Sequence, residues 1–283
     1  MKVPVLSVAL APGLALAMPA LAQSAPVIEP NESVFDGDFV IVGAGAVAAP
    51  SYEGSDTLSV IPAGGLAGRI GGIGISPRAA GIALDLVADA DRKVGFALGP
   101  VARYRSNRSG NVRDPVVARL GKLKGVIEAG VNAGVGVKHV LNGYDSLSVS
   151  VDMRWDVSGH GSGYIVSPGV SYLTPLSKAI VVGAAGTVNF VDRRYAEYNF
   201  GITPAGALAS GLPAYSARGG FKDWSIGAFA GYDLGGDFRD GGLSIAAGAT
   251  YSRLHGSAAE SPITTLRGKR GQWLFGGGLA YAF

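Results

Sequence analysis

The sequence predicts an all-β protein, a single antiparallel transmembrane β-barrel of about 12 strands with short periplasmic turns and long outer loops. Three observations support this prediction. Segments of about 9 to 13 residues alternate between bulky apolar and small or polar side chains. Glycine contributes 45 of the 283 residues without the three-residue period of collagen. Charged residues make up only 16% of the chain, against about 25% in ordinary soluble domains.

The N-terminal segment resembles a secretory leader. Lys2 is followed by an apolar stretch that is too short for a transmembrane helix and ends in small residues, which mark cleavage before Gln23. We therefore expect a signal peptide at 1–22 and a barrel at 23–283, in the cell outer membrane.

The composition argues against several functions. The absence of cysteine excludes disulfides and thiolate zinc sites, and a net charge of +3 gives no reason to expect a nucleic-acid partner. We expect no cofactor, no metal site and no catalytic residues. The segment 43–48 fits the dinucleotide motif G-x-G-x-x-G/A, but Pro50 and turn-forming residues follow where that motif needs a helix.

The period-two pattern places the strands in order. The count is twelve, with ten as the alternative, because Pro77 and scattered glycines leave open whether residues 69–88 form one strand or two. The expected strands are 38–49, 57–67, 71–77, 80–88, 92–104, 127–137, 147–157, 163–173, 178–190, 223–234, 241–253 and 271–283.

Two central strands show the clearest alternation, and Asn142-Gly143 between them indicates a tight hairpin. Their polar face is expected to turn to the lumen. These charges either line a solute path or pair across neighbouring strands, and the presence of both signs favours pairing. The lumen-facing charges are Glu128, Lys138, Asp152, Arg154 and Asp156.

The last strand carries aromatic and other bulky residues at odd positions and ends on Tyr281 and Phe283. A C-terminal strand of this kind is typical of outer-membrane barrels, and we expect these two residues to be the assembly signal.

The loops offer two further hypotheses. His160, beside Asp156, is either the general base of a serine hydrolase or simply a polar residue in a glycine-rich loop. The basic loop that begins at Ser106, with Arg108 among its cations, is a candidate contact for lipopolysaccharide phosphates, beside the outer-membrane lipid that any barrel contacts.

The longest loop, 191–222, carries a specific resemblance, supported by Pro50 to Ser55 and Tyr251 to Leu254. The sequence resembles the MipA/OmpV family, the MltA-interacting outer-membrane proteins. The residues that carry it in this loop include Arg194, Tyr195, Tyr198, Phe200, Gly201, Pro204 and Tyr215.

The resemblance implies a non-enzymatic barrel whose named member is a scaffold between a lytic murein transglycosylase and a murein synthase. Murein-processing proteins are therefore the expected partners. The alternatives are a passive small-solute channel and a surface-exposed receptor or adhesin barrel. Because the longest loop is rich in aromatic and small residues, we also expect it to fold over or into the barrel mouth.

Overall fold

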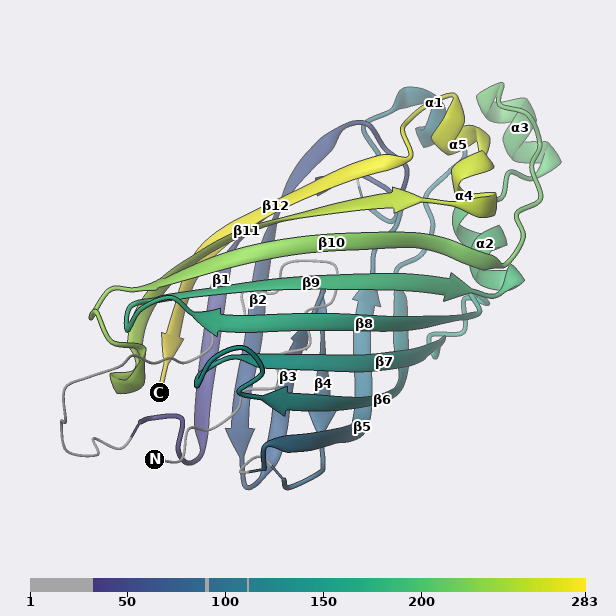
Figure 1. Cartoon of the computed structure of the whole chain (residues 1–283). Coiled ribbons are helices and arrows are strands. Elements are labelled where there is room, and N and C mark those ends of the chain that lie inside the picture. Colours follow the sequence, from purple (N-terminus) through teal and green to yellow (C-terminus); the bar gives the residue numbers. More distant parts are fainter. Residues whose placement is uncertain (1–32, 90–91, 111) are drawn as a thin grey trace.

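The computed structural model describes residues 33–89, 92–110 and 112–283, which form a closed barrel of antiparallel strands (Figure 1). Each strand pairs with its neighbours in sequence, and the last pairs with the first. The expected count of twelve is confirmed, whereas the expected signal peptide lies outside the described residues. The strands are β1 (Phe39–Pro50), β2 (Leu58–Ile70), β3 (Ile73–Arg78), β4 (Gly81–Asp85), β5 (Val94–Arg105), β6 (Val126–Lys138), β7 (Ser146–Asp156), β8 (Tyr164–Pro175), β9 (Ile180–Val191), β10 (Gly220–Asp233), β11 (Gly242–Leu254) and β12 (Gly271–Ala282).

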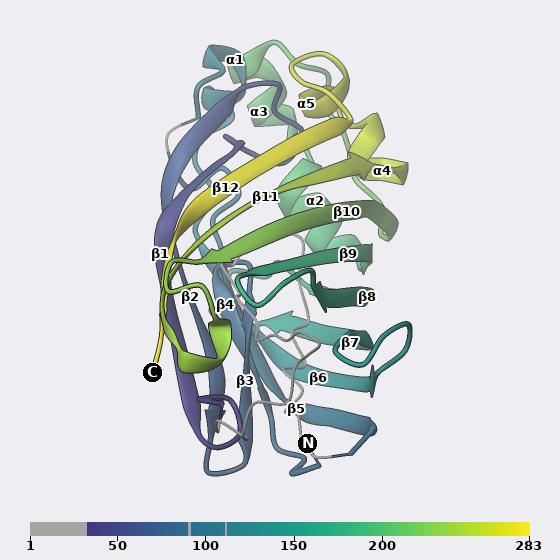
Figure 2. The same cartoon turned by 60° about the vertical axis from the view of Figure 1, so that its left-hand side comes forward.

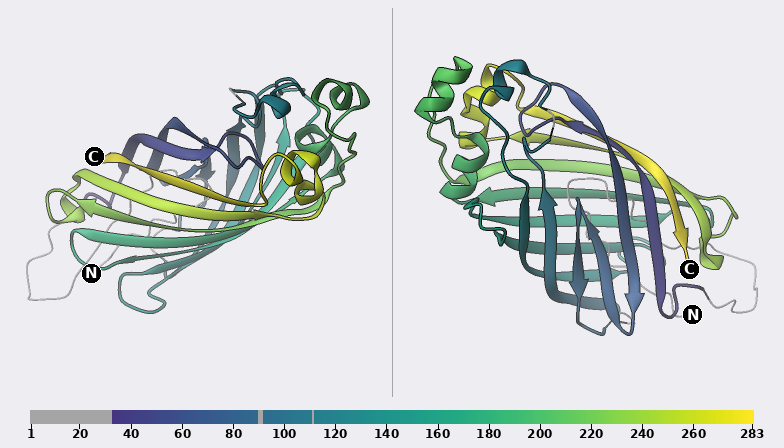
Figure 3. Two further views of the ribbon diagram at one scale, coloured as in Figure 1. Left: turned by 90° about the horizontal axis from the view of Figure 1, so that it is seen from above. Right: turned by 180° about the vertical axis from the view of Figure 1, so that it is seen from behind.

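The ambiguous stretch 69–88 forms two short strands, so the ten-stranded alternative is wrong. β3 and β4 make a hairpin whose tip contains Ala80 at φ 51°. This hairpin is shorter than the neighbouring strands. As a result, β2 pairs with β3 through only three residue pairs. The back view in Figure 3 shows the short hairpin between the longer β2 and β5.

The strands turn alternate residues outward, as the pattern predicted. Val149 of β7 is 56% exposed and lies between Val135 of β6 and Val170 of β8 on the lipid-facing side. On β12, Trp273 and Tyr281 are similarly exposed. A belt of apolar and aromatic side chains around a closed sheet is the surface that a bilayer requires.

The lumen-facing positions of β1 and β12 carry mostly small residues. Gly43 pairs with Ala280, and Gly45 pairs with Gly278. A Cβ atom at Gly45 would collide with the carbonyl oxygen of Gly277, so the two backbones approach as closely as glycine permits. The dinucleotide-like motif is therefore part of a strand seam and precedes no helix.

The long connections 106–125, 192–219 and 255–270 all lie at one end of the barrel, which we term the loop end. Figures 1 and 2 show their helices gathered there. Among the described residues, no helix is both long and apolar enough to cross a membrane. The helices are α1 (Pro115–Ala118), α2 (Arg193–Phe200), α3 (Pro204–Ser210), α4 (Gly256–Glu260) and α5 (Pro262–Thr265).

The opposite end, which we term the turn end, holds both ends of the described chain and the short connections 71–72, 139–145, 176–179 and 234–241 (Figure 1). Here Phe35 and Phe238 are buried in an apolar cluster with residues of β1, β9, β11 and β12. The amide of Val34 donates to the carbonyl oxygen of Arg239, which joins the segment before β1 to the short 3-10 helix Phe238–Asp240 (η1). Part of the lumen at the turn end is therefore filled by aromatic side chains.

The turn between β6 and β7 is organised by Asp145. Its carboxylate accepts hydrogen bonds from the amides of Val140 and Leu141 and from the hydroxyl of Tyr172 at 2.7 to 2.8 Å. Burial opposes ionisation, but these bonds prevail and hold the pKa of Asp145 below its usual value. The connection is thus a seven-residue loop, 139–145, closed by a carboxylate.

Candidate functional site at the loop end of the lumen

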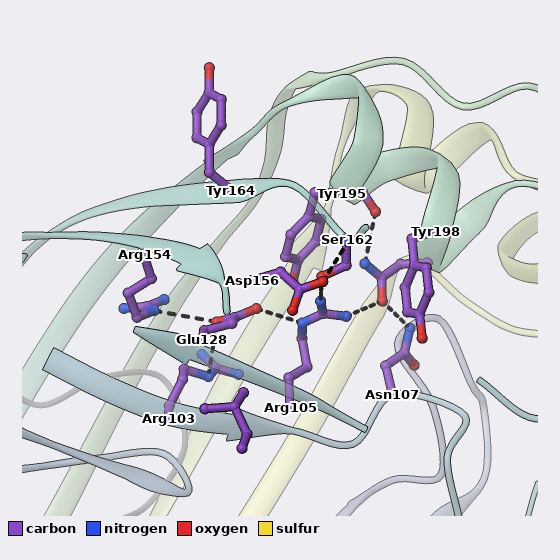
Figure 4. Close-up of polar contacts among 12 residues, drawn as sticks. Arg103, Arg105, Asn107, Glu128, Arg154, Asp156, Ser162, Tyr164, Tyr195 and Tyr198 are labelled. Carbon is purple, nitrogen blue, oxygen red and sulfur yellow. Dashed lines mark hydrogen bonds and ion pairs between the residues drawn. The ribbon is translucent and has the colours of Figure 1, made fainter. Parts of the chain in front are cut away.

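A buried charge network lies on the lumen face near the loop end (Figure 4). Glu128 of β6 forms ion pairs with Arg105 of β5 at 2.6 Å, Arg154 of β7 at 3.4 Å and Arg103 of β5 at 3.6 Å. The alternating strand geometry places these residues on one face, because Glu128 lies directly opposite Arg103 and Gly130 lies opposite Arg154. One carboxylate thus compensates several guanidinium groups.

The network continues deeper into the barrel through Asp152. Its carboxylate pairs with Arg78 at 2.8 Å and with Arg154 at 2.8 Å, and it accepts a hydrogen bond from Asn132 at 2.6 Å. Arg78 comes from the tip of the short β3–β4 hairpin, 74 positions away in sequence. The hairpin is therefore fixed to the central strands by a buried ion pair.

Helix α2 covers this network. Asp192 caps the helix, since its carboxylate accepts a hydrogen bond from the amide of Tyr195 at 2.9 Å. Tyr195 and Phe200 are then almost fully buried, in a cluster with residues of β8, β9, β11 and α4. Because an aromatic face directed into the barrel removes apolar surface from water, this burial holds α2 against the strands.

Arg105 connects the barrel wall to α2. Its guanidinium lies over the ring of Tyr195, 4.5 Å from the centroid, and donates hydrogen bonds to Asn199 of α2 and, at 2.7 Å, to Ser162 of the β7–β8 loop. Figure 4 shows the Arg105 side chain between Glu128 and Tyr195. One residue therefore joins the wall, the helix and a neighbouring loop.

The remaining loop-end segments close around α2. The hydroxyl of Ser261 donates to the carbonyl oxygen of Phe200 at 2.7 Å, and the hydroxyl of Tyr215 donates to the carbonyl oxygen of Ser257 at 2.8 Å. We term residues 192–219 and 255–270 together the lid. Helix α3 lies on its outside, where Leu208 is 90% exposed. The expectation that the longest loop folds over the mouth agrees with this arrangement, and α2 supplies the buried part.

A second ion cluster fixes the β1–β2 loop. Lys222 of β10 contacts Glu53 at 3.0 Å and Asp223 at 2.9 Å, and its ammonium lies 5.4 Å from the ring centroid of Tyr195. Burial disfavours the ionised carboxylate of Glu53, but the nearby cations, Lys222 and Arg105 foremost, hold the pKa of Glu53 below its usual value. Tyr195 is thus flanked by two cations.

Below the network, the lumen contains a pocket that is open to solvent. Its walls come from β2 to β7, and 11 of its 24 lining residues are glycine, alanine or serine. The basic residues that line it are Arg69, Arg78, Arg92 and Lys138, and the acidic ones are Asp85 and Asp89.

His160 does not form a hydrolase triad. Ser158 donates its hydroxyl hydrogen bond to Asp156 at 2.6 Å and contacts the Nδ1 atom of His160 at 3.1 Å. In a triad the carboxylate orients the histidine, whereas here it binds the serine. Within the described residues, no group of three or more His, Asp or Glu side chains could hold a metal ion.

The residues singled out from the sequence fall into separate groups. Glu128, Asp152 and Arg154 belong to the network, whereas Lys138 is buried at the pocket and Asp156 is half-buried at the rim. Of the loop residues, Tyr195 and Phe200 form the core of the lid, and Tyr215 bonds across it. At the turn end of the barrel, Tyr281 and Phe283 are exposed, and their ring centroids lie 4.7 Å apart. The sequence analysis did not identify Glu53, Arg78, Arg103, Arg105, Asn199 and Lys222.

Comparison with known protein families assigns the chain to one of them. Residues 42–283 match the family described as MltA-interacting protein MipA. The chain belongs to this family. In this member of the MltA-interacting protein family, the match begins within β1 and includes every later strand and both loops of the lid. A search of curated proteins found no match.

Solved structures similar to this family member are outer-membrane barrels. An outer membrane channel from Pseudomonas putida F1 has a TM-score of 0.47 and 13% identity, over 92% of this chain and 100% of that one. The NanC porin has a TM-score of 0.41 and 8% identity, over 86% and 98%. The toluene transporter TodX from Pseudomonas putida has a TM-score of 0.35 and 11% identity, over 87% and 89%.

Proposed function

We propose that this protein is a non-enzymatic scaffold of the cell outer membrane that holds murein-processing enzymes at the periplasmic face, with its turn end toward the periplasm and its lid toward the outside. The family description, an MltA-interacting protein, supports a murein-processing partner. The observation that carries the proposal is the lid itself. A mouth covered by a buried helix and tied to the wall through Arg105 suits a membrane anchor better than an open pore.

The first experiment tests the partner. The tagged protein is crosslinked in cells and purified from the detergent-solubilised envelope, and the co-purifying proteins are identified by mass spectrometry. We expect a lytic transglycosylase and a murein synthase to be enriched over a matched sample from an unrelated barrel of similar abundance. No enrichment of murein-processing enzymes would contradict the scaffold.

The rival function is a passive small-solute channel, and the lumenal pocket, whose lining carries four basic and two acidic residues, favours it. Planar-bilayer recordings separate the two. We expect little steady conductance from the intact chain and a clear rise when residues 198–214, which include the end of α2 and all of α3, are replaced by a short Gly-Ser linker. Large, stable, ohmic steps from the unmodified protein would favour the channel.

A further inference from the structure

Arg108 is a buried arginine for which the described residues provide no counter-ion. It follows β5 in the loop 106–125, and only 4% of its surface is exposed. Its Nε and Nη1 atoms are buried without a hydrogen-bond partner among the residues that the structure describes. Because a buried charge is strongly unfavourable unless it is paired, a guanidinium in this state indicates that a compensating group is bound to it in use.

The loop holds Arg108 in a fixed position. Its φ of 51° is uncommon for a residue other than glycine, and its carbonyl oxygen accepts a hydrogen bond from Leu123 at 3.2 Å. The preceding Asn107 accepts from the amide of Glu53 at 2.9 Å and donates to Asn199 at 3.0 Å. A non-glycine residue held in this conformation by bonds to two other segments is typical of ligand sites.

The ionisable groups that face Arg108 are the phenols of Tyr52 and Tyr198. Tyr52 donates its hydroxyl hydrogen to the carbonyl oxygen of Arg267 at 3.0 Å, and Tyr198 donates to that of Lys124 at 2.9 Å. Burial lowers the pKa of Arg108 to about 10 and raises the pKa of Tyr52 to about 12. At neutral pH a cation therefore faces neutral hydroxyl groups.

We propose that Arg108 is the centre of a binding site for a phosphate group. A guanidinium presents a planar fork of donors that matches two oxygens of one oxyanion. Exposed cations on the same loop, among them Arg119 and Lys122, raise the local concentration of anions and favour a multiply charged one. The phosphate group can come from two sources, free inorganic phosphate or lipopolysaccharide. The second source rests on the outer-membrane location given under the proposed function.

The test compares Arg108→Met with the wild type and with Arg119→Met, a matched change of an exposed arginine on the same loop. The full barrel in non-ionic detergent is melted in phosphate-free buffer and again with millimolar phosphate at constant ionic strength. Without phosphate, Arg108→Met should have the higher Tm, because it removes an uncompensated buried charge. Phosphate should raise the Tm of the wild type and of Arg119→Met by on the order of 5 °C and leave Arg108→Met unchanged.

Additional samples distinguish inorganic phosphate from lipopolysaccharide as the source of the phosphate group. Intact and dephosphorylated lipopolysaccharide are added to the same samples in place of phosphate. A wild-type rise with intact lipopolysaccharide alone assigns the site to the lipid, and a rise with inorganic phosphate assigns it to a free anion; neither result depends on a murein partner. If Arg108→Met does not fold, phosphorus NMR titration of the wild type decides. Equal shifts in wild type and Arg108→Met, or no saturable binding to the wild type, would overturn the proposal.

Discussion

Replacing Arg105 by Gln should loosen the lid while leaving the barrel closed. Glu128 keeps its ion pairs with Arg103 and Arg154, so its carboxylate remains compensated. The variant loses the charge-assisted hydrogen bond to Asn199, worth about 1.5 to 3 kcal/mol, and the cation–π contact with Tyr195, worth about 0.5 to 2 kcal/mol.

These losses set the size of the effect. Because Gln can restore part of the hydrogen bonding, we take a net loss of about 2 to 4 kcal/mol from the closed state. Each 1.4 kcal/mol corresponds to a factor of ten, so the open fraction of the lid should rise about 30-fold to 1,000-fold.

Limited proteolysis under native conditions measures this fraction, because cleavage of a transiently open segment follows its population when opening is fast. The cleavage rate within 192–219 should rise accordingly in Arg105→Gln. Arg103→Gln is the matched control: it also removes a partner of Glu128, but Arg103 has no hydrogen bond to the lid among the described residues. Equal cleavage rates in the two variants would refute the role of Arg105 in holding the lid.

Three further changes test the barrel itself. Val149→Arg, on the lipid-facing side, should cost about 2 to 4 kcal/mol in reversible unfolding from lipid vesicles, and Ser150→Arg, at the lumenal pocket, much less; equal losses would contradict the register. Changing Tyr281 and Phe283 to Ser should leave the chain degraded in the periplasm, and normal heat-modifiable mobility in the outer membrane would argue against an assembly signal. Asp145→Asn should flatten the acid side of the stability curve. Because the folded pKa of Asp145 lies below the unfolded value, its contribution is present above pH of about 4 and is lost as pH falls through the folded pKa, so parallel curves for variant and wild type in that range would exclude this role.

The barrel could be predicted from the sequence because its strands are specified locally. Each residue of a membrane-spanning strand faces either lipid or lumen. The sequence of such a strand therefore alternates between apolar and small or polar residues with a period of two. Even 69–88 carried enough alternation to suggest two strands. The boundaries were less certain: the predicted strand 92–104 stops one residue before Arg105, which placed that residue in a loop although it continues the lumen-facing series of β5.

The network and the lid depend on contacts that local patterns do not encode. Arg105 and Asn199 are 94 positions apart, and the hydrogen bond between them exists only because the loop folds back over the barrel. Helix α3 did carry local signals, since Thr203 caps it, Pro204 begins it and Gly211 ends it at φ 77°. Asn142-Gly143 indicated a tight hairpin, but the carboxylate of Asp145 binds three backbone amides and closes a longer turn.

The glycine-rich seam between β1 and β12 has a consequence for how the barrel closes. On its lumen side, Gly45 and Gly278 have no side chains that could interlock, so a slip of two residues would keep every face and meet little resistance there. Such a slip would change the shear of the sheet and therefore the tilt of its strands and its diameter. The alignment must then be selected by the larger residues on either side of these glycines. On the lipid side Val42 meets Tyr281 and Ala44 meets Leu279, and on the lumen side Phe39 and Ile41 are buried in the apolar cluster at the turn end. We therefore expect the bulky residues beside the seam to select one circumference among several that the glycine backbone alone would accept.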